Sequence, residues 1–186
     1  SNYYSILNPT YHPADGLLGY DASGNVYYKG YLSHDGRYYS YSPRNTSDVF
    51  YKKLVIAVLN GNTGQLVRVI DDGIGDYVWY RDISNYSSAL VKGVVSDAAT
   101  NRIAYLVRKY GSYINEETIY IRNASDGSLF KTITRSGRGD DQVLSSYRGL
   151  FFIRDSSTQQ ITAYRFSDGS VAWETNVSGG VADTII

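Results

Sequence analysis

Short polar clusters that end in glycine interrupt runs of alternating apolar and polar residues at four places along the chain. The four glycines are Gly24, Gly64, Gly127 and Gly169. An alternating run follows each cluster, and another such run precedes each of the last three. Period-two alternation is typical of strands, and glycine tolerates the positive φ that tight hairpin turns require. The pattern predicts four β-hairpins, with positive φ at Gly127 and Gly169.

The runs between these hairpins predict further strands and no helix. The hairpins are expected at 16–20 with 25–29, 53–59 with 65–70, 118–122 with 128–134, and 160–166 with 170–177. Additional strands are expected at 77–80, 90–95, 102–108, 142–146 and 149–154, and loops at 43–48, 81–88 and 111–117. The chain is therefore expected to be all-β.

The spacing of the turn glycines predicts a repeat. The intervals between them are 40, 63 and 42 residues, and the longest contains the additional segment 76–88. A period near forty with four strands per unit is typical of propeller blades. We expect a β-propeller-like array of three to four four-stranded antiparallel blades over 20–186, preceded by an amino-terminal arm over 1–19. Because propellers usually have four to eight blades, we expect a segment of a larger propeller or edges completed by neighbouring subunits.

Composition removes several function classes. The chain has 186 residues, with 18 Lys and Arg against 18 Asp and Glu, so its formal net charge is zero. A neutral chain provides no general field that attracts nucleic acid or an anionic membrane. No apolar run approaches the length of a membrane span. The 20 tyrosines favour strands, since aromatic side chains suit a half-buried pleated surface.

The absence of cysteine and the presence of four sequons favour a cell-surface protein. With no cysteine, disulfides and thiolate chemistry are excluded, and the lack of methionine indicates a processed product or a piece of a longer chain. The acceptor pattern Asn-x-Ser/Thr occurs at Asn45, Asn85, Asn123 and Asn176. Unmodified loop asparagines are the equally weighted alternative. We predict an extracellular or cell-surface location, with these four asparagines exposed and most of them glycosylated.

One stretch resembles a known repeat. Ala163-Tyr164, Asp168-Gly169 and Trp173 match the strand–turn–strand pattern of pyrroloquinoline-quinone-type (PQQ-like) propeller repeats, and Thr63-Gly64 and Asp126-Gly127 match its turn. Arg68 and Lys131, or residues near them, stand where the pattern has tryptophan, so the full pattern is present once. The resemblance covers about three blades and extends to WD40-type repeats through 33–38. It implies a propeller fold, but no stretch matches the residues that hold the quinone and its calcium ion, and fold alone does not fix function.

No cofactor, metal site or catalytic residue is expected. The two histidines, His12 and His34, have no second histidine at ligand spacing. The carboxylates of 71–76 miss the EF-hand spacing, so a solvated turn is the favoured interpretation, and the pair Asp140–Asp141 is a weaker candidate still. The tripeptide Arg138-Gly139-Asp140 resembles an integrin-binding motif, but a turn between blades is favoured there too.

The clustered tyrosines leave two interpretations open. Adjacent tyrosines in a strand face opposite sides, so pairs such as Tyr27-Tyr28 place one ring away from the core. These rings form either a binding surface for carbohydrate or protein, or cross-strand packing on a half-exposed sheet.

Two functions from different classes follow. The first is a non-catalytic extracellular structural or adhesive protein, such as a filament or surface-layer subunit, that binds copies of itself or other surface proteins through its strand edges. The alternative is a fragment of a quinone-dependent dehydrogenase or a glycan-processing propeller enzyme. Added quinone and calcium should change absorbance and melting temperature only under the alternative.

Overall fold

The computed structural model describes residues 17–33, 38–39, 52–70, 77–78, 87–111, 115–136 and 141–177. Antiparallel strands fill most of these ranges, and they contain no helix. Consequently, no described segment has the helical length and apolarity needed to cross a membrane. The strands form three sheets, which confirms the all-β expectation.

The first sheet has six strands. They are β1 (Leu17–Tyr20), β2 (Asn25–Ser33), β3 (Tyr38–Tyr39), β4 (Lys52–Asn60), β5 (Leu66–Ile70) and β6 (Tyr77–Val78). Its main path runs β1-β2-β4-β5, with β3 paired to β2 and β6 paired to β4. The strands of this path follow one another in chain order, as in a meander, except that β3 intervenes between β2 and β4.

The second and third sheets are four-stranded meanders. The second consists of β7 (Ser87–Asp97), β8 (Arg102–Gly111), β9 (Asn115–Asn123) and β10 (Leu129–Ser136). The third consists of β11 (Gln142–Tyr147), β12 (Leu150–Arg154), β13 (Gln160–Arg165) and β14 (Val171–Asn176). The loop expected over 111–117 is shorter than predicted, because β8 continues through Gly111 and β9 begins at Asn115.

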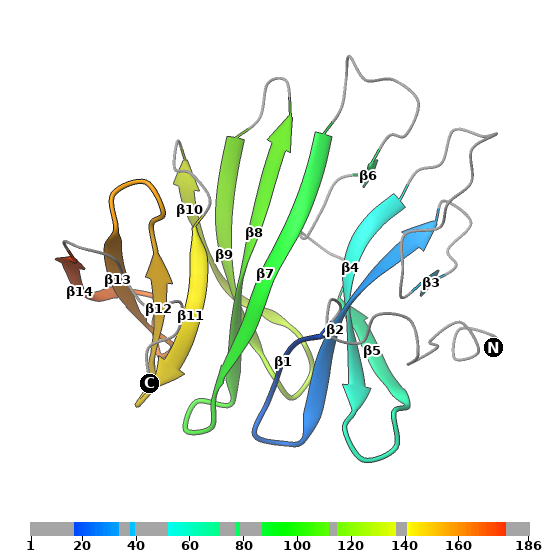
Figure 1. Ribbon diagram of the computed structural model, residues 1–186. Helices are drawn as coiled ribbons and strands as arrows, with labels where there is room; N and C mark the ends of the chain where they lie inside the picture. The colour runs from blue at the N-terminus through cyan, green and yellow to red at the C-terminus, as the bar shows by residue number, and fades with distance from the viewer. Residues whose placement is uncertain are drawn as a thin grey trace.

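The three sheets stand in a row, with the second between the other two (Figure 1). Their first strands contact one another, β1 with β7 and β7 with β11. The β1–β7 approach is close enough that a Cβ on Gly19 would lie 2.0 Å from the Val94 carbonyl oxygen. A side chain at position 19 would therefore push the first two sheets apart.

Apolar side chains fill both spaces between sheets. The first-to-second cluster contains Tyr27, Ile56, Val58, Ile70, Val91, Val94, Ile103, Tyr105, Val107, Tyr120 and Ala124. The second-to-third cluster contains Ala104, Leu106, Ile119, Ile121, Phe151, Ile153, Tyr164 and Phe166. Strand β8 supplies both clusters, because its successive side chains face opposite sides of the sheet. Strands β8 and β9 in the middle of the row are thus buried on both faces.

The turns recur in the same form in each sheet. The glycines Gly64, Gly127 and Gly169 close the hairpins between the third and fourth strands of their main paths, with φ of 72°, 76° and 74°. The positive φ expected at Gly127 and Gly169 is therefore present. In each turn the glycine N–H donates to the carbonyl four residues earlier, at Asn60, Asn123 and Arg165.

Gly24 belongs to a different turn, and this corrects the predicted period. It lies between the first two strands of the first sheet, where Asn101 and Gly149 occupy the matching places with φ of 52° and 79°. The carbonyls of Gly24, Asn101 and Gly149 accept the backbone N–H of Gly61, Ala124 and Phe166, respectively, each at 2.9 Å. The 40-residue interval from Gly24 to Gly64 therefore lies within one sheet and does not join equivalent turns of two successive sheets.

Candidate functional site

The fourth strand of the first sheet docks on a turn of the second. Arg68, four residues after Gly64, donates from Nη1 to the Ala124 carbonyl at 3.0 Å and from Nη2 to the Ser125 carbonyl at 2.7 Å. Its side chain also lies over Gly127, where an added Cβ would be 2.9 Å from Arg68 Cδ. Glycine at 127 therefore permits both the turn and the contact.

The same contact recurs between the second and third sheets. Lys131, four residues after Gly127, donates from Nζ to the Asp168 carbonyl at 2.8 Å. A Cβ on Gly169 would lie 2.7 Å from Lys131 Cδ. Arg102 adds hydrogen bonds to the carbonyls of Phe166 and Ser167, at 2.8 and 2.6 Å. We call the residue four positions after the turn glycine the docking residue.

Trp173 is the docking residue of the third sheet, because it follows Gly169 by four positions. The pairing register agrees, since Arg68 lies opposite Val58, Lys131 opposite Ile121, and Trp173 opposite Ala163. Val58 and Ile121 face the next sheet in the row. Ala163 lies on the outer face of the third sheet, within the cluster that includes Phe152 and Ile161.

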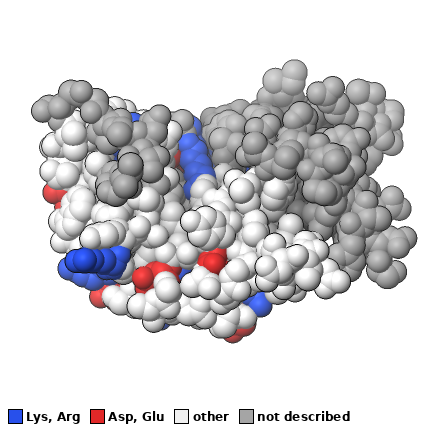
Figure 2. All heavy atoms as spheres, turned by 60° about the horizontal axis from the view of Figure 1, so that its bottom comes forward, with Lys and Arg blue, Asp and Glu red and all other residues white. Residues whose placement is uncertain are grey.

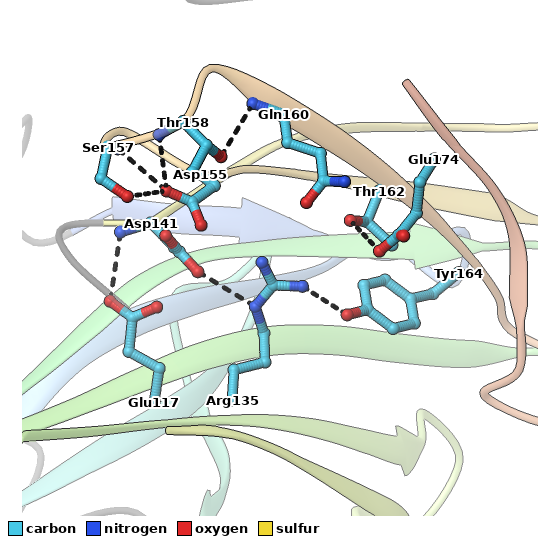
Figure 3. A network of polar contacts seen from close by, with 10 residues as sticks. All are labelled: Glu117, Arg135, Asp141, Asp155, Ser157, Thr158, Gln160, Thr162, Tyr164 and Glu174. Carbon is cyan, nitrogen blue, oxygen red and sulfur yellow. Dashed lines mark hydrogen bonds and ion pairs between the residues drawn. The ribbon is translucent and has the colours of Figure 1, made fainter. Parts of the chain in front are cut away.

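A buried charge network joins the second and third sheets (Figure 3). Arg135 of β10 donates from Nε to Asp141 Oδ2 at 3.0 Å and from Nη1 to the Tyr164 hydroxyl. The Asp141 backbone N–H donates to Glu117 Oε1 at 3.1 Å. Glu117 and Asp141 are fully buried, and Arg135 is 6% exposed. Removing one member would leave the other charge buried without compensation, so the packing of the two sheets is sensitive to this network.

Burial shifts the ionisation of this network. Burial, followed by a side-chain hydrogen bond with Asp141, raises the pKa of Glu117 to about 7 from its ordinary 4.5, although the backbone N–H of Asp141 opposes that shift. Burial also lowers the pKa of Lys92, although the nearby Glu117 charge opposes that shift. Glu117 therefore titrates near neutral pH, because burial and the charge of Asp141 outweigh the opposing charge of Lys92.

Short-range polar contacts shape the neighbouring end of the third sheet (Figure 3). Asp155 Oδ1 accepts the backbone N–H of Ser157 at 2.8 Å and its hydroxyl at 2.6 Å. An open depression of about 460 Å³ lies beside this turn, lined by Thr158, Gln160, Asn176 and Val177. Its lining offers amide and hydroxyl groups and no charged side chain.

The sequence-predicted glycosylation residues lie apart. Asn176 is exposed on β14 at this depression. Asn123 is half-buried and its Nδ2 donates to Ser128 Oγ at 2.9 Å within the turn, so it is less accessible than the exposed side chain that we predicted. Asn45 and Asn85 lie outside the described residues, and use of all four sites stays a prediction.

Most other sequence candidates also lie outside the described residues. These are His12, His34, the carboxylates of 71–76, the tripeptide 138–140 and the rings at 3–4 and 79–80. Asp141, considered as half of a weak calcium pair, forms the ion pair with Arg135 instead. No group of three or more His, Cys, Asp or Glu side chains gathers in the described ranges. The tyrosine pair on β2 does divide between faces, because Tyr27 is in the core and Tyr28 packs on the outer face.

Sequence reasoning missed the charge network, although a signal was present. Glu117 shares its strand face with Ile119 and Ile121, and Arg135 shares its face with Ile133. The two charged residues are also direct cross-strand partners. Opposite charges in phase with the apolar positions of two paired strands indicate a buried pair.

Known proteins add nothing to the assignment of a function to this site. No protein-family model and no curated protein matches this chain.

Proposed function

We propose that this chain is a non-catalytic structural or adhesive protein of the cell surface, built as a propeller-like array. The observation that carries the proposal is the repeated docking of one sheet's fourth strand on the next sheet's turn, through Arg68 and Lys131. Because the contact recurs with the same register between successive sheets, the same interface could join further sheets to the row, as in repeat proteins. The contacts among the first strands fit blades arranged around an axis.

Each outer face of the row carries an apolar cluster. The first sheet's outer face carries a cluster of Tyr28, Val55, Ala57, Leu59, Leu66 and Val69. The third sheet's outer face carries Leu150, Phe152, Ile161, Ala163, Ala172 and Val177. Val55, Ala57 and Ala163 are fully buried, so the centres of both clusters are already covered within one chain, and only the partly buried members offer apolar surface to a partner.

Electrostatic attraction is not what brings partners to this chain in the proposed function. Figure 2 shows the end of the sheets where the hairpin turns lie, and its described surface is mostly uncharged, with separate basic and acidic side chains. The formal net charge of the chain is zero. Partners recognised by shape and apolar contact, including further copies of the chain, fit this surface better than a polyanion does.

The test is the native mass, measured by light scattering over a range of concentrations and by negative-stain microscopy. We expect particles larger than the 20.7 kDa chain. A chain that stays monomeric at every concentration contradicts the assembling role. Intact mass spectrometry of native material tests the location, since a glycosylated chain exceeds the polypeptide mass and Asn176→Gln removes one glycan.

A further inference from the structure

Each of the two docking contacts has two halves, which are a docking residue on one sheet and a receiving turn on the next. Arg68 meets the turn that contains Gly127, and Lys131 meets the turn that contains Gly169. One docking residue and one receiving turn remain without each other in the described part of the chain. These are Trp173 on the third sheet and the turn of Gly64 on the first.

Trp173 is held in position for a contact of this kind. Its side chain is 43% exposed, and its ring packs on Phe152 with 5.6 Å between ring centroids and a tilt of 38°. An indole ring offers a flat apolar surface with one N–H donor at its edge. It can therefore cover a glycine and donate to a turn carbonyl, as the stem and the charged end of Lys131 do at Gly169.

The turn of Gly64 has the same internal geometry as the turns already occupied. Asn60 N–H donates to the Gln65 carbonyl at 2.8 Å, and Gly64 N–H donates to the Asn60 carbonyl at 2.7 Å. In the occupied turn of the second sheet, the matching bonds at Asn123 and Gly127 measure 2.9 and 2.8 Å. A Cβ on Gly64 would meet nothing within 4 Å, so the space over this glycine is open.

We propose that Trp173 of one copy docks on the Gly64 turn of a second copy, so that the chain associates head to tail. The first and third sheets lie at opposite ends of the row, so the two halves cannot meet within one chain (Figure 1). The contact continues the interface that the chain already uses twice between its own sheets. Two copies joined at both ends bring together six main sheets, which is within the four to eight blades of closed propellers.

This inference rests on the proposed function and names its partner as the chain itself. The experiment measures self-association of the full chain by sedimentation velocity for the wild type and for Trp173→Ala, Trp173→Arg and Gly64→Ala. Tyr147→Ala is the control for losing an exposed aromatic ring, because Tyr147 is 58% exposed on the third sheet. Gly24→Ala is the control for backbone strain, because Gly24 has φ of 84° and equally open space.

We expect Trp173→Ala and Gly64→Ala to weaken association at least about tenfold, which corresponds to about 1.4 kcal/mol. Both controls should associate as the wild type does. Trp173→Arg should retain association, because Arg68 fills the matching position; an unspecific apolar contact would instead be lost. An equimolar mixture of Trp173→Ala and Gly64→Ala should form a heterodimer, since each variant keeps the half that the other lacks.

The outcomes distinguish a failure of this inference from a failure of the proposed function. If the wild type associates and Trp173→Ala associates equally well, the docking inference is wrong while the assembling role stands. If the wild type is monomeric at every concentration, both are wrong. A mixture that does not restore association contradicts the head-to-tail arrangement.

Discussion

The two interfaces between sheets share a docking position but differ behind it. The first-to-second interface is filled largely by aliphatic side chains and tyrosines, and its Tyr27 hydroxyl donates to the buried Asp21 at 2.8 Å. The second-to-third interface adds a buried ion pair between Arg135 and Asp141. The docking contact is therefore the general element, since it survives a change of core chemistry and a change from Arg68 to Lys131.

The largest effect is expected from breaking the ion pair. Arg135→Met should lower the free energy of unfolding by about 3–5 kcal/mol, because it leaves the Asp141 carboxylate buried without its cation. Tyr27→Phe at the other interface removes one neutral donor to Asp21 and should have a smaller effect of about 1–3 kcal/mol. Urea unfolding at pH 7 measures both. The double variant Arg135→Met/Asp141→Asn should recover part of the loss, and no recovery would contradict the assigned cause.

The second prediction concerns pH. The folded protein holds the Glu117 proton more tightly than the unfolded chain does, because the folded pKa is about 7 and the ordinary value is 4.5. The contribution of Glu117 to stability is therefore complete below about pH 4.5, falls as pH rises to about 7, and is lost above it.

Glu117→Gln should remove most of this slope, while Tyr27→Phe at the first interface should leave it unchanged. We expect Glu117 to lower the free energy of unfolding by about 1–3 kcal/mol across that window, since one pKa unit corresponds to about 1.36 kcal/mol. Urea titrations at intervals of half a pH unit measure the slope. An identical slope in Glu117→Gln would assign the dependence to another group.

The third prediction compares the turn glycines. Alanine at any of them is strained by the positive φ, at about 1 kcal/mol. Gly127→Ala and Gly169→Ala should lose about 1 kcal/mol more than Gly64→Ala, because their added Cβ would lie within 2.9 Å of a docking side chain. Thermal unfolding of dilute monomer measures the difference. Equal losses at all three positions would mean that the docking side chains adjust without cost.

The smallest effect is expected from the docking side chains themselves. Arg68→Ala removes two hydrogen bonds to carbonyls, at 3.0 and 2.7 Å, and should lower the free energy of unfolding by about 1–2 kcal/mol. Lys131→Ala removes one bond from an exposed side chain and should lower it by less than about 1 kcal/mol. The order of the two effects, measured by chemical unfolding, is the result that matters. A larger loss at Lys131 would reverse the ranking of the interfaces.

The hairpins were predictable because their signals are local. Asp126-Gly127 and Asp168-Gly169 carry the turn geometry in two or three residues, and the flanking strands alternate visibly. The period was misjudged because Gly24 has the same local chemistry as Gly64 but joins a different pair of strands. The residues of a turn do not show which pair of strands in a sheet it connects. The observed strand pairing is therefore needed to correct the period.

The candidate site was predictable only in part. The match of Trp173 to the repeat pattern followed from the sequence, and so did the place of Arg68 and Lys131 to within a neighbouring residue. What those residues touch did not follow, because each contact joins positions more than thirty residues apart. The Arg135–Asp141 pair also escaped prediction, since an acidic residue after a glycine-rich turn is normally solvated.

The sequence by itself determined the strands, the turn glycines and the short connections that make neighbouring strands pair, because these depend on backbone preferences over a few residues. The tertiary structure alone decided which turn receives which side chain, which charges are buried, and that Glu117 titrates near neutral pH. The physical reason is that desolvation and close packing depend on groups brought together from distant parts of the chain. Those groups become neighbours only when the sheets stack.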